Sequence, residues 1–350
     1  MTVLFLLALV FAFSAGLTLV LRRYALQRNL MDVPNARSSH SVPTPRGGGV
    51  AIVVASLLAI ALLGAIGVLP AYVAIGLALS SLMVAAVGYV DDLRHVAARW
   101  RLMVHLGAGL LLVAFVGSLP PVPFFSGEIA LGWLALPLVV LSLGWLLNLY
   151  NFMDGIDGIA AAEAVTVCLA MTLLLWAWDE IELAVAVAAL GAASLGFLVW
   201  NWPPARIFMG DAGSGFVGFT FGALVVVSWA DAAFPIWPWL IMLGVFIVDA
   251  SITLARRVLR GERFYEAHRS HAYQHASRRF GAHRPVTLAV IAINLLWLLP
   301  LAWMAVGNPG LGPLFLAIAW APLVVVALLF HAGLPEPAHS DRTESQPGKQ

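Results

Sequence analysis

The sequence predicts an all-α, polytopic membrane protein of about 11 transmembrane helices, with its reactive side chains at the cytoplasmic face. The 350 residues are 61% hydrophobic and only 11% charged, and the mean hydropathy is +0.93, whereas soluble domains carry about 25% charged residues. Apolar runs of about 20 residues, the length that crosses a bilayer, recur along the chain. All nineteen Lys and Arg residues fall in segments that an alternating path places on one side.

Eleven apolar runs define the expected helices. They lie near residues 2–21, 48–68, 71–90, 102–119, 131–149, 159–177, 182–200, 213–229, 236–255, 285–305 and 312–331. The first run lacks a positive amino-terminal region and is longer than a signal-peptide core of about 7–15 residues. We therefore interpret it as a spanning helix that Arg22 and Arg23 end on the inner side. An odd number of crossings then places the N-terminus outside and the C-terminus inside.

Charge is sorted by side along this path. The basic residues occupy segments 22–47, 91–101, 201–212, 256–284 and 332–350. The intervening outer segments carry only acidic charge, for example Glu128 and Glu180. Cytoplasmic loops retain Lys and Arg, so these five segments are predicted to be cytoplasmic. Residues 1–331 are predicted to form one transmembrane catalytic domain, and the Pro-rich, polar residues 332–350 a disordered cytoplasmic tail.

Acidic and amide side chains gather in three stretches that the alternating path places on the inner side, near residues 91–92, 148–157 and 211. They are Asp91, Asp92, Asn148, Asn151, Asp154, Asp157 and Asp211. Five carboxylates on one face would repel one another without a cation, and Mg²⁺ typically takes one or two carboxylates together with substrate phosphates. Singly, each Asp is equally well explained as a helix cap or a solvated loop residue. The only cysteine, Cys168, excludes a disulfide framework and a cysteine-based metal site.

Basic side chains and glycines supply the complementary charge on the same face. His268-Arg269-Ser270-His271 suits a diphosphate better than a metal that already has carboxylates, although a basic loop also binds anionic lipid. Arg37, His40 and Arg46 form a similar set in the first loop. The glycines at 47–49 and 213–215 begin predicted helices, where free backbone amides attract phosphate. Packing of small residues is the alternative explanation.

Five motifs, in this order, resemble the polyprenyl-phosphate N-acetylhexosamine-1-phosphate transferase family, of the glycosyltransferase 4 type. The motifs cover residues 32–275. The first is Asp-Val-Pro-Asn-Ala-Arg-Ser-Ser-His at 32–40 with Pro-Arg-Gly-Gly-Gly at 45–49, and the second is Asp-Asp at 91–92. The others are Asn-Leu-Tyr-Asn-Phe-Met-Asp-Gly-Ile-Asp-Gly at 148–158, Phe-Met-Gly-Asp-Ala-Gly-Ser at 208–214, and His-Arg-Ser-His-Ala-Tyr-Gln-His at 268–275, the histidine loop. The third and fourth motifs are highly specific. The first loop is more similar to the branch that initiates O-antigen, enterobacterial common antigen and teichoic acid than to the muramoyl-pentapeptide branch.

The resemblance implies a reaction. A UDP-N-acetylhexosamine gives its sugar-1-phosphate to undecaprenyl phosphate, UMP is released, and a lipid-linked diphosphate sugar begins a cell-surface polysaccharide such as O-antigen. It implies a multi-pass protein of the bacterial inner membrane, in contact with the bilayer, without nucleic acid, and compatible with a homodimer. The identity of the hexosamine stays open.

The resemblance also implies roles for the site residues. Mg²⁺, with Mn²⁺ as a substitute, would be held by Asp211 with Asn151 close by. The implied catalytic residues are Asp91, Asp92, Asp154 and Asp157. The implied substrate-binding residues are Asn148, His268, Arg269, His271, Arg37, His40 and Arg46. This chain has His-Arg-Ser-His-Ala-Tyr-Gln-His at 268–275, where many relatives have a tighter histidine run.

Two mechanisms and two other functions remain open. The acceptor phosphate is largely dianionic near neutral pH, because its second pKa is about 6, which favours direct attack over a covalent aspartyl intermediate. An intramembrane prenyltransferase would also use Mg²⁺ and aspartates, but usually four residues apart on one helical face. A transporter or flippase would need ionisable groups near the bilayer midplane, for which Asp249 and His105 are the nearest candidates.

Overall fold

The computed structural model describes residues 2–34, 42–94, 96–230, 234–262 and 268–335. Within these residues the regular secondary structure is helical apart from two short hairpins. The helices are α1 (Thr2–Gln27), α2 (Val50–Ala65), α3 (Ala71–Leu93), α4 (Ala98–Val116), α5 (Ala135–Met153), α6 (Ile159–Ala177), α7 (Ile181–Asn201), α8 (Asp211–Ala230), α9 (Trp237–Met242), α10 (Gly244–Leu259), α11 (Ala272–Phe280), α12 (Arg284–Ala292), α13 (Leu299–Gly307) and α14 (Gly312–Leu329). Single 3₁₀ turns cover Gly132–Leu134 and Pro309–Leu311, and a π-helical segment at Ile293–Leu298 joins α12 to α13.

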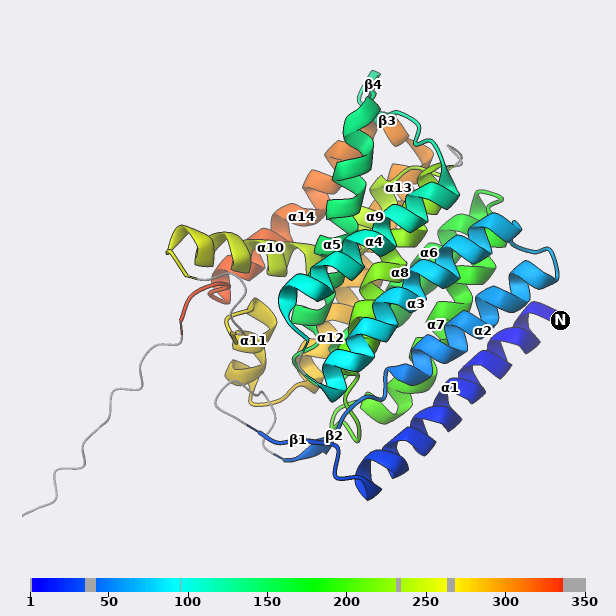
Figure 1. Ribbon diagram of the computed structural model, residues 1–350. Helices are drawn as coiled ribbons and strands as arrows, with labels where there is room; N and C mark the ends of the chain where they lie inside the picture. The colour runs from blue at the N-terminus through cyan, green and yellow to red at the C-terminus, as the bar shows by residue number, and fades with distance from the viewer. Residues whose placement is uncertain (1, 35–41, 95, 231–233, 263–267, 336–350) are drawn as a thin grey trace, which may run out of the picture.

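Each hairpin is an antiparallel strand pair. β1 (Met31–Asp32) pairs with β2 (Thr44–Pro45), with Met31 opposite Pro45. β3 (Val122–Phe124) pairs with β4 (Gly127–Ile129), with Val122 opposite Ile129. The two hairpins lie at opposite ends of the helical bundle (Figure 1).

Nine helical segments in the described part of the chain are long and apolar enough to cross a membrane. They are Val3–Gln27, Ala71–Leu93, Ala98–Val116, Gly132–Met153, Ile159–Ala177, Ile181–Asn201, Asp211–Ala230, Arg284–Gly307 and Pro309–Leu329. The predicted all-α, polytopic membrane fold is therefore confirmed. The count of eleven is not, because α2 has only 16 residues and the run predicted at 236–255 is divided into α9 and α10.

The division between α9 and α10 has a local cause. The indole N–H of Trp320, on α14, donates to the carbonyl of Leu240 at 3.1 Å. In a continuous helix that carbonyl would accept the amide of Gly244, four residues further on. Insertion of a side chain into this ladder interrupts a helix. The chain therefore changes direction near Leu243, and α10 extends to one side of the bundle (Figure 1).

Helix α8 forms the centre of the bundle, and nearly all of its residues are buried. Close packing against α3 depends on Gly88, because a side chain there would approach the carbonyl oxygen of Asp211 to 2.7 Å and the Cα atom of Ala212 to 2.9 Å. Glycine at such a position lets two helix backbones come together. This contact sets the C-terminal end of α3 beside the N-terminal end of α8.

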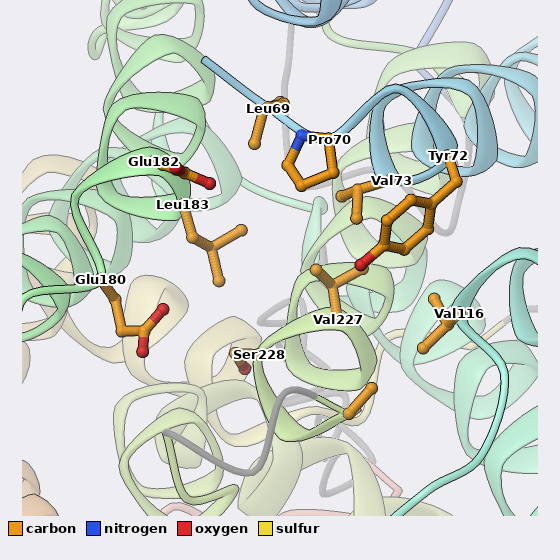
Figure 2. A pocket seen from close by; sticks show the side chains of 11 residues that line it. Leu69, Pro70, Tyr72, Val73, Val116, Glu180, Glu182, Leu183, Val227 and Ser228 are labelled. Atoms are coloured by element: carbon orange, nitrogen blue, oxygen red, sulfur yellow. The ribbon is translucent and has the colours of Figure 1, made fainter. Parts of the chain in front are cut away.

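Segments predicted to alternate between two sides do lie at opposite ends of the bundle. At the end that carries β3 and β4, the amide of Phe125 donates to the carbonyl of Gly310 at 2.6 Å. A cavity of about 110 Å³ at the same end has Glu180 and Glu182 on one side and Tyr72 on the other (Figure 2). The segments with the aspartate and histidine motifs meet at the other end.

Candidate active site

Asp92 caps the helix that carries Asp211. The two oxygens of its carboxylate accept the backbone amides of Asp211 (3.1 Å) and Ala212 (3.0 Å). These amides belong to the first turn of α8, where no carbonyl within the helix is available, and a negative charge is favourable there. The guanidinium of Arg46 donates to the carbonyl oxygen of Asp92 at 2.7 Å. Asp92 is thus fixed by α8 and by the first inner segment.

Asp91, its neighbour, is neutralised from α4. Its side chain is only 7% exposed and forms an ion pair with Arg101. Its second oxygen accepts the backbone amide of Val96 at 2.8 Å. Arg101 also lies 3.8 Å from the carboxylate of Asp211. One guanidinium therefore bridges two of the predicted site aspartates.

Asp154, directly after the last residue of α5, differs from Asp91 and Asp92 in its contacts. Within the described residues, its carboxylate makes neither a hydrogen bond nor an ion pair. Burial raises the pKa of Asp154 well above its usual value, and the negative charges of Asp211, Asp92 and Asp157 raise it further. The carboxylates of Asp92 on α3, Asp211 on α8 and Asp157 in the α5–α6 loop are thus close enough to Asp154 for their charges to act on it.

Asp157 lies in the same loop and is held by two other segments. Its carboxylate accepts the amide of Ala205 at 3.0 Å and lies 3.2 Å from Nδ1 of His283. Thr287, on α12, donates to its backbone carbonyl. The loop ends at Gly158, whose φ of +76° favours glycine. Asp157 therefore joins the aspartates to the basic segment before α12.

The two predicted amide ligands differ in surroundings. Asn151 accepts the hydroxyl of Ser214, on α8, at 3.0 Å, which places it beside the first turn after Asp211. Asn148 lies one turn earlier on α5 and donates to the carbonyl of Gly144 within its own helix. Asn151 is thus placed by contact with α8, whereas the substrate-binding role of Asn148 stays a prediction.

The histidine loop lies against the α5–α6 loop. The rings of His268 and His271 stack with centroids 4.9 Å apart, and the ring of Phe152 lies 6.1 Å and 6.4 Å from them. The carbonyl of Arg269 accepts the guanidinium of Arg278 at 3.1 Å. Of the predicted basic set, Arg37 and His40 fall outside the described residues.

The expectation that free glycine amides bind phosphate is wrong. The amides of Gly48 and Gly49 donate to the carbonyls of Phe208 and Met209, both at 2.9 Å. Those of Gly213 and Ser214 donate to the carbonyl of Gly210, both at 3.1 Å. The earlier amides of α8 are taken by Asp92. The glycines serve close packing of the segments, which was the alternative explanation.

The oxygen donors present are of the kind that Mg²⁺ prefers, although no group of three or more His, Cys, Asp or Glu residues in the described ranges is arranged as a metal site. Two observations support the fit. Among the described residues Asp154 is a carboxyl group without a hydrogen-bond or ion-pair partner, on which neighbouring negative charges act, and the Asp211 side chain is 39% exposed, lies 3.8 Å from Arg101 and has the Asp91 carboxylate at hydrogen-bond distance. Two carboxylates completed by substrate phosphates are sufficient for Mg²⁺.

A larger cavity adjoins these aspartates. Its volume is about 690 Å³, within the range of small-molecule sites. Asp157, Thr44 and Phe208 line one part, and basic residues line another, namely Arg278, His283 and Arg284. His283 and Arg284 could not be predicted as site residues from sequence, because their place beside Asp157 depends on how α12 packs. Arg101 was not predicted either, because its place beside Asp91 and Asp211 depends on how α4 packs.

The fold and this site define a multi-pass helical membrane protein with an acidic centre and a basic cavity at one end. The model of glycosyl transferase family 4 matches residues 74–229, which include Asp91, Asp154 and Asp211. This match, together with the relatives described next, supports membership of this family.

Its relatives carry related names. It is 29% identical to the probable undecaprenyl-phosphate N-acetylglucosaminyl 1-phosphate transferase of Bacillus subtilis, over 80% of this chain and 79% of that protein. It is 25% identical to the undecaprenyl-phosphate alpha-N-acetylglucosaminyl 1-phosphate transferase of Escherichia coli K12, over 82% and 80%. A phospho-N-acetylmuramoyl-pentapeptide-transferase of Moorella thermoacetica is 32% identical over 52% of this chain and 61% of its own length.

Proposed function

We propose that this protein is a Mg²⁺-dependent sugar-1-phosphate transferase of the bacterial inner membrane. It transfers N-acetylhexosamine-1-phosphate from a UDP-sugar to undecaprenyl phosphate and releases UMP. The product, a lipid-linked diphosphate sugar, begins a surface polysaccharide such as O-antigen. Two relatives named as undecaprenyl-phosphate transferases, each matched over about four fifths of its length, support this choice of acceptor.

One observation carries the proposal: Asp154 has no hydrogen-bond or ion-pair partner among the described residues, and the negative charges of Asp211, Asp92 and Asp157 act on it. Such an arrangement is unfavourable unless positive charge is added. When bound there, Mg²⁺ would be held by Asp211 and Asp154, with Asn151 close by, and would offset the negative charge of the donor diphosphate. Asp92 and Asp91 would maintain the geometry, through α8 and through Arg101.

The cavities give both substrates room. The polar cavity of about 690 Å³ has room for a nucleotide, and Arg278 and Arg284 in its lining offer positive charge to phosphates. An apolar cavity of about 310 Å³ lies between α5, α8, α9 and α14, with Val122 of β3 and Ile247 of α10 also in its lining. Leu149, two residues before Asn151, lines it, so a prenyl chain that leaves this cavity past Leu149 would bring its phosphate toward the aspartates.

The reaction proposed is a direct displacement. An oxygen of the acceptor phosphate forms a bond to the phosphorus that carries the sugar, and the bond from that phosphorus to the bridging oxygen breaks, so that UMP leaves with that oxygen. Little base catalysis is needed, because the acceptor is already largely dianionic near neutral pH. The task of this chain is to orient two anions, which suits the basic residues around the cavity.

The alternative functions lose support. A prenyltransferase would present carboxylates along one helical face, whereas these come from two helix ends and a loop. A transporter would use Asp249 as a free ionisable group, but its carboxylate accepts the amides of Ala272 and Tyr273.

Purified protein given undecaprenyl phosphate, Mg²⁺ and a panel of UDP-N-acetylhexosamines tests the proposal. We expect UMP release that requires both lipid and metal, with one sugar preferred. Absence of UMP release with every sugar, from folded protein, would overturn the proposal.

Orientation is tested by labelling. In a Cys168→Ala background, a cysteine replacing Ser270 should resist an impermeant thiol reagent in intact cells and react in inverted vesicles. Labelling in intact cells would reverse the proposed sidedness.

A further inference from the structure

The chain continues past α14 as a short segment that lies between α10 and α11 (Figure 1). Residues 332–334, which we call the C-terminal strap, are the first of the segment that the sequence predicts as a tail. Near the end of α10, the guanidinium of Arg256 donates to the carbonyl of Ala332 at 3.0 Å. The guanidinium of Arg260 donates to the carbonyl of Gly333 at 2.9 Å. Two charge-assisted hydrogen bonds therefore hold the strap on α10.

The contact between the strap and α10 requires glycine at position 333. The φ of Gly333 is +76°, in the region that favours glycine. A Cβ atom there would lie 2.8 Å from the Cβ atom of Arg256 and 2.8 Å from the carbonyl oxygen of Thr253. Real Cβ atoms do not approach other atoms so closely, and the Thr253 carbonyl belongs to the helix backbone. Any larger residue at this position would therefore force the strap away from α10.

The strap also holds the histidine loop. The amide of Gly333 donates to the carbonyl of Ser270 at 2.7 Å. The hydroxyl of Ser270 lies 3.0 Å from Nδ1 of His268. Residues 268–270 belong to no helix or strand, so their position depends on contacts of this kind. One backbone hydrogen bond from the strap thus attaches the non-helical part of the loop to α10.

The attached part of the loop is the part that a ligand can reach. His268, Arg269 and Ser270 keep some of their surface exposed, whereas His271 is buried. The ring of His268 lies 6.1 Å from the ring of Phe152, which is two residues before Asp154. The accessible basic residues of the loop therefore lie beside the segment that carries Asp154, and the strap contributes to their placement.

We propose that the C-terminal strap is a positioning element of the transfer site: by holding the carbonyl of Ser270, Gly333 sets the place of the loop that carries His268 and Arg269. The inference rests on the proposed function and on the assignment of these two residues to the donor diphosphate. The strap acts through the loop and does not itself contact substrate. Its displacement should therefore weaken use of the UDP-sugar more than binding of the lipid acceptor.

Two strap variants with matched controls separate this role from general damage. Gly333→Ala forces the strap away from α10. Gly261→Ala is its control, because Gly261 has nearly the same φ, +75°, but an added Cβ atom would meet nothing within 4 Å. Arg256→Gln removes one donor to the strap without adding volume. Arg279→Gln is its control, because it removes the same charge from α11, where the guanidinium lies over the ring of Phe330.

Initial rates with each substrate varied in turn give the first readout. We expect kcat/KM for the UDP-sugar to fall at least about 10-fold in Gly333→Ala and about 3-fold or more in Arg256→Gln, since misplacement by about 1 Å can cost about 100-fold. KM for undecaprenyl phosphate in the strap variants, and every constant in the controls, should stay within about twofold of wild type. Equal losses in a strap variant and its control, or unchanged rates in both strap variants, would refute the inference.

Hydrogen exchange gives a second readout that needs neither activity nor substrate. The backbone amides of residues 268–275 should exchange faster in Gly333→Ala and in Arg256→Gln than in wild type and in the two controls, because the loop has lost an attachment. Unchanged exchange would refute the inference whatever the rates are. Faster exchange with undiminished transfer would refute the positioning role.

The two readouts also separate this inference from the proposed function. Faster exchange in the strap variants of a protein that, as wild type, transfers no sugar phosphate would overturn the proposed function and leave the attachment of the loop intact. If Gly333→Ala does not fold, Arg256→Gln and Arg279→Gln still decide, because neither adds volume or changes the backbone conformation that the glycine requires.

Discussion

Replacement of Asp92 by Asn tests whether this carboxylate is structural or catalytic. Asn has one accepting oxygen, so one of the two α8 amides would face an NH₂ group and lose its partner. A hydrogen bond to a charged group contributes about 1.5–3 kcal/mol, the remaining bond would be weaker, and the favourable charge at the helix N-terminus, worth about 0.3–1 kcal/mol, would be lost. We expect the free energy of unfolding to fall by about 2–5 kcal/mol.

Thermal unfolding in detergent, measured beside initial transfer rates, checks this expectation. A loss of that size should lower Tm by about 5–15 °C. Asp211→Asn is the matched control, because it removes the same charge at the same helix end without removing a backbone hydrogen bond, and its Tm should stay within about 2 °C of wild type. An Asp92→Asn protein with an unchanged Tm and no transfer would show that Asp92 acts in the chemistry, and the capping argument would be wrong.

Three further expectations concern single acidic side chains. Asp211→Asn should lower transfer at least about 100-fold at unchanged expression, beyond the loss expected for an indirect partner; full activity would remove Asp211 from the site. Because the folded-state pKa of Asp154 is raised above its ordinary value of 3.8, its neutral form stabilises the fold at acid pH and this stabilisation is lost as pH rises. Asp154→Asn should therefore be more stable than wild type in metal-free buffer at neutral pH, with the difference vanishing near pH 4; equal Tm values at both pH values would contradict this. Glu163, fully buried, accepts the amide of Asn294 at 2.7 Å, so Glu163→Gln should keep Tm and activity, whereas Glu163→Leu should cost about 1–3 kcal/mol; a Gln variant as unstable as Leu would show that the charge is needed.

The spanning helices were predictable from sequence because each depends on composition within about 20 residues. The run at 159–177 agrees with α6 at both ends. The run at 236–255 fails because its interruption depends on Trp320, which is remote in sequence and reaches Leu240 only after α14 has packed. Hydropathy averaged over a window contains no information about such a contact.

The membership of the site was more predictable than the role of each residue. Spacing and residue type were sufficient to gather Asp91, Asp92, Asp154 and Asp211 at one end. They could not show that Asp92 occupies the N-terminus of α8, the position that was expected to bind phosphate. That outcome depends on Gly88, which brings α3 close enough for a side chain to replace a ligand.

The five aspartates divide by the way in which their charge is balanced. Asp91 faces Arg101, Asp92 faces two helix amides, and Asp157 faces His283 and the amide of Ala205. Asp154 and Asp211 differ from these three, because within the described part of the protein neither carboxyl group has a cation or a backbone amide at hydrogen-bond distance, and burial together with neighbouring carboxylates raises the pKa of Asp154. We propose that an anionic donor approaching these two carboxyl groups needs added positive charge. Mg²⁺ accepts one or two carboxylates, which is the number left over.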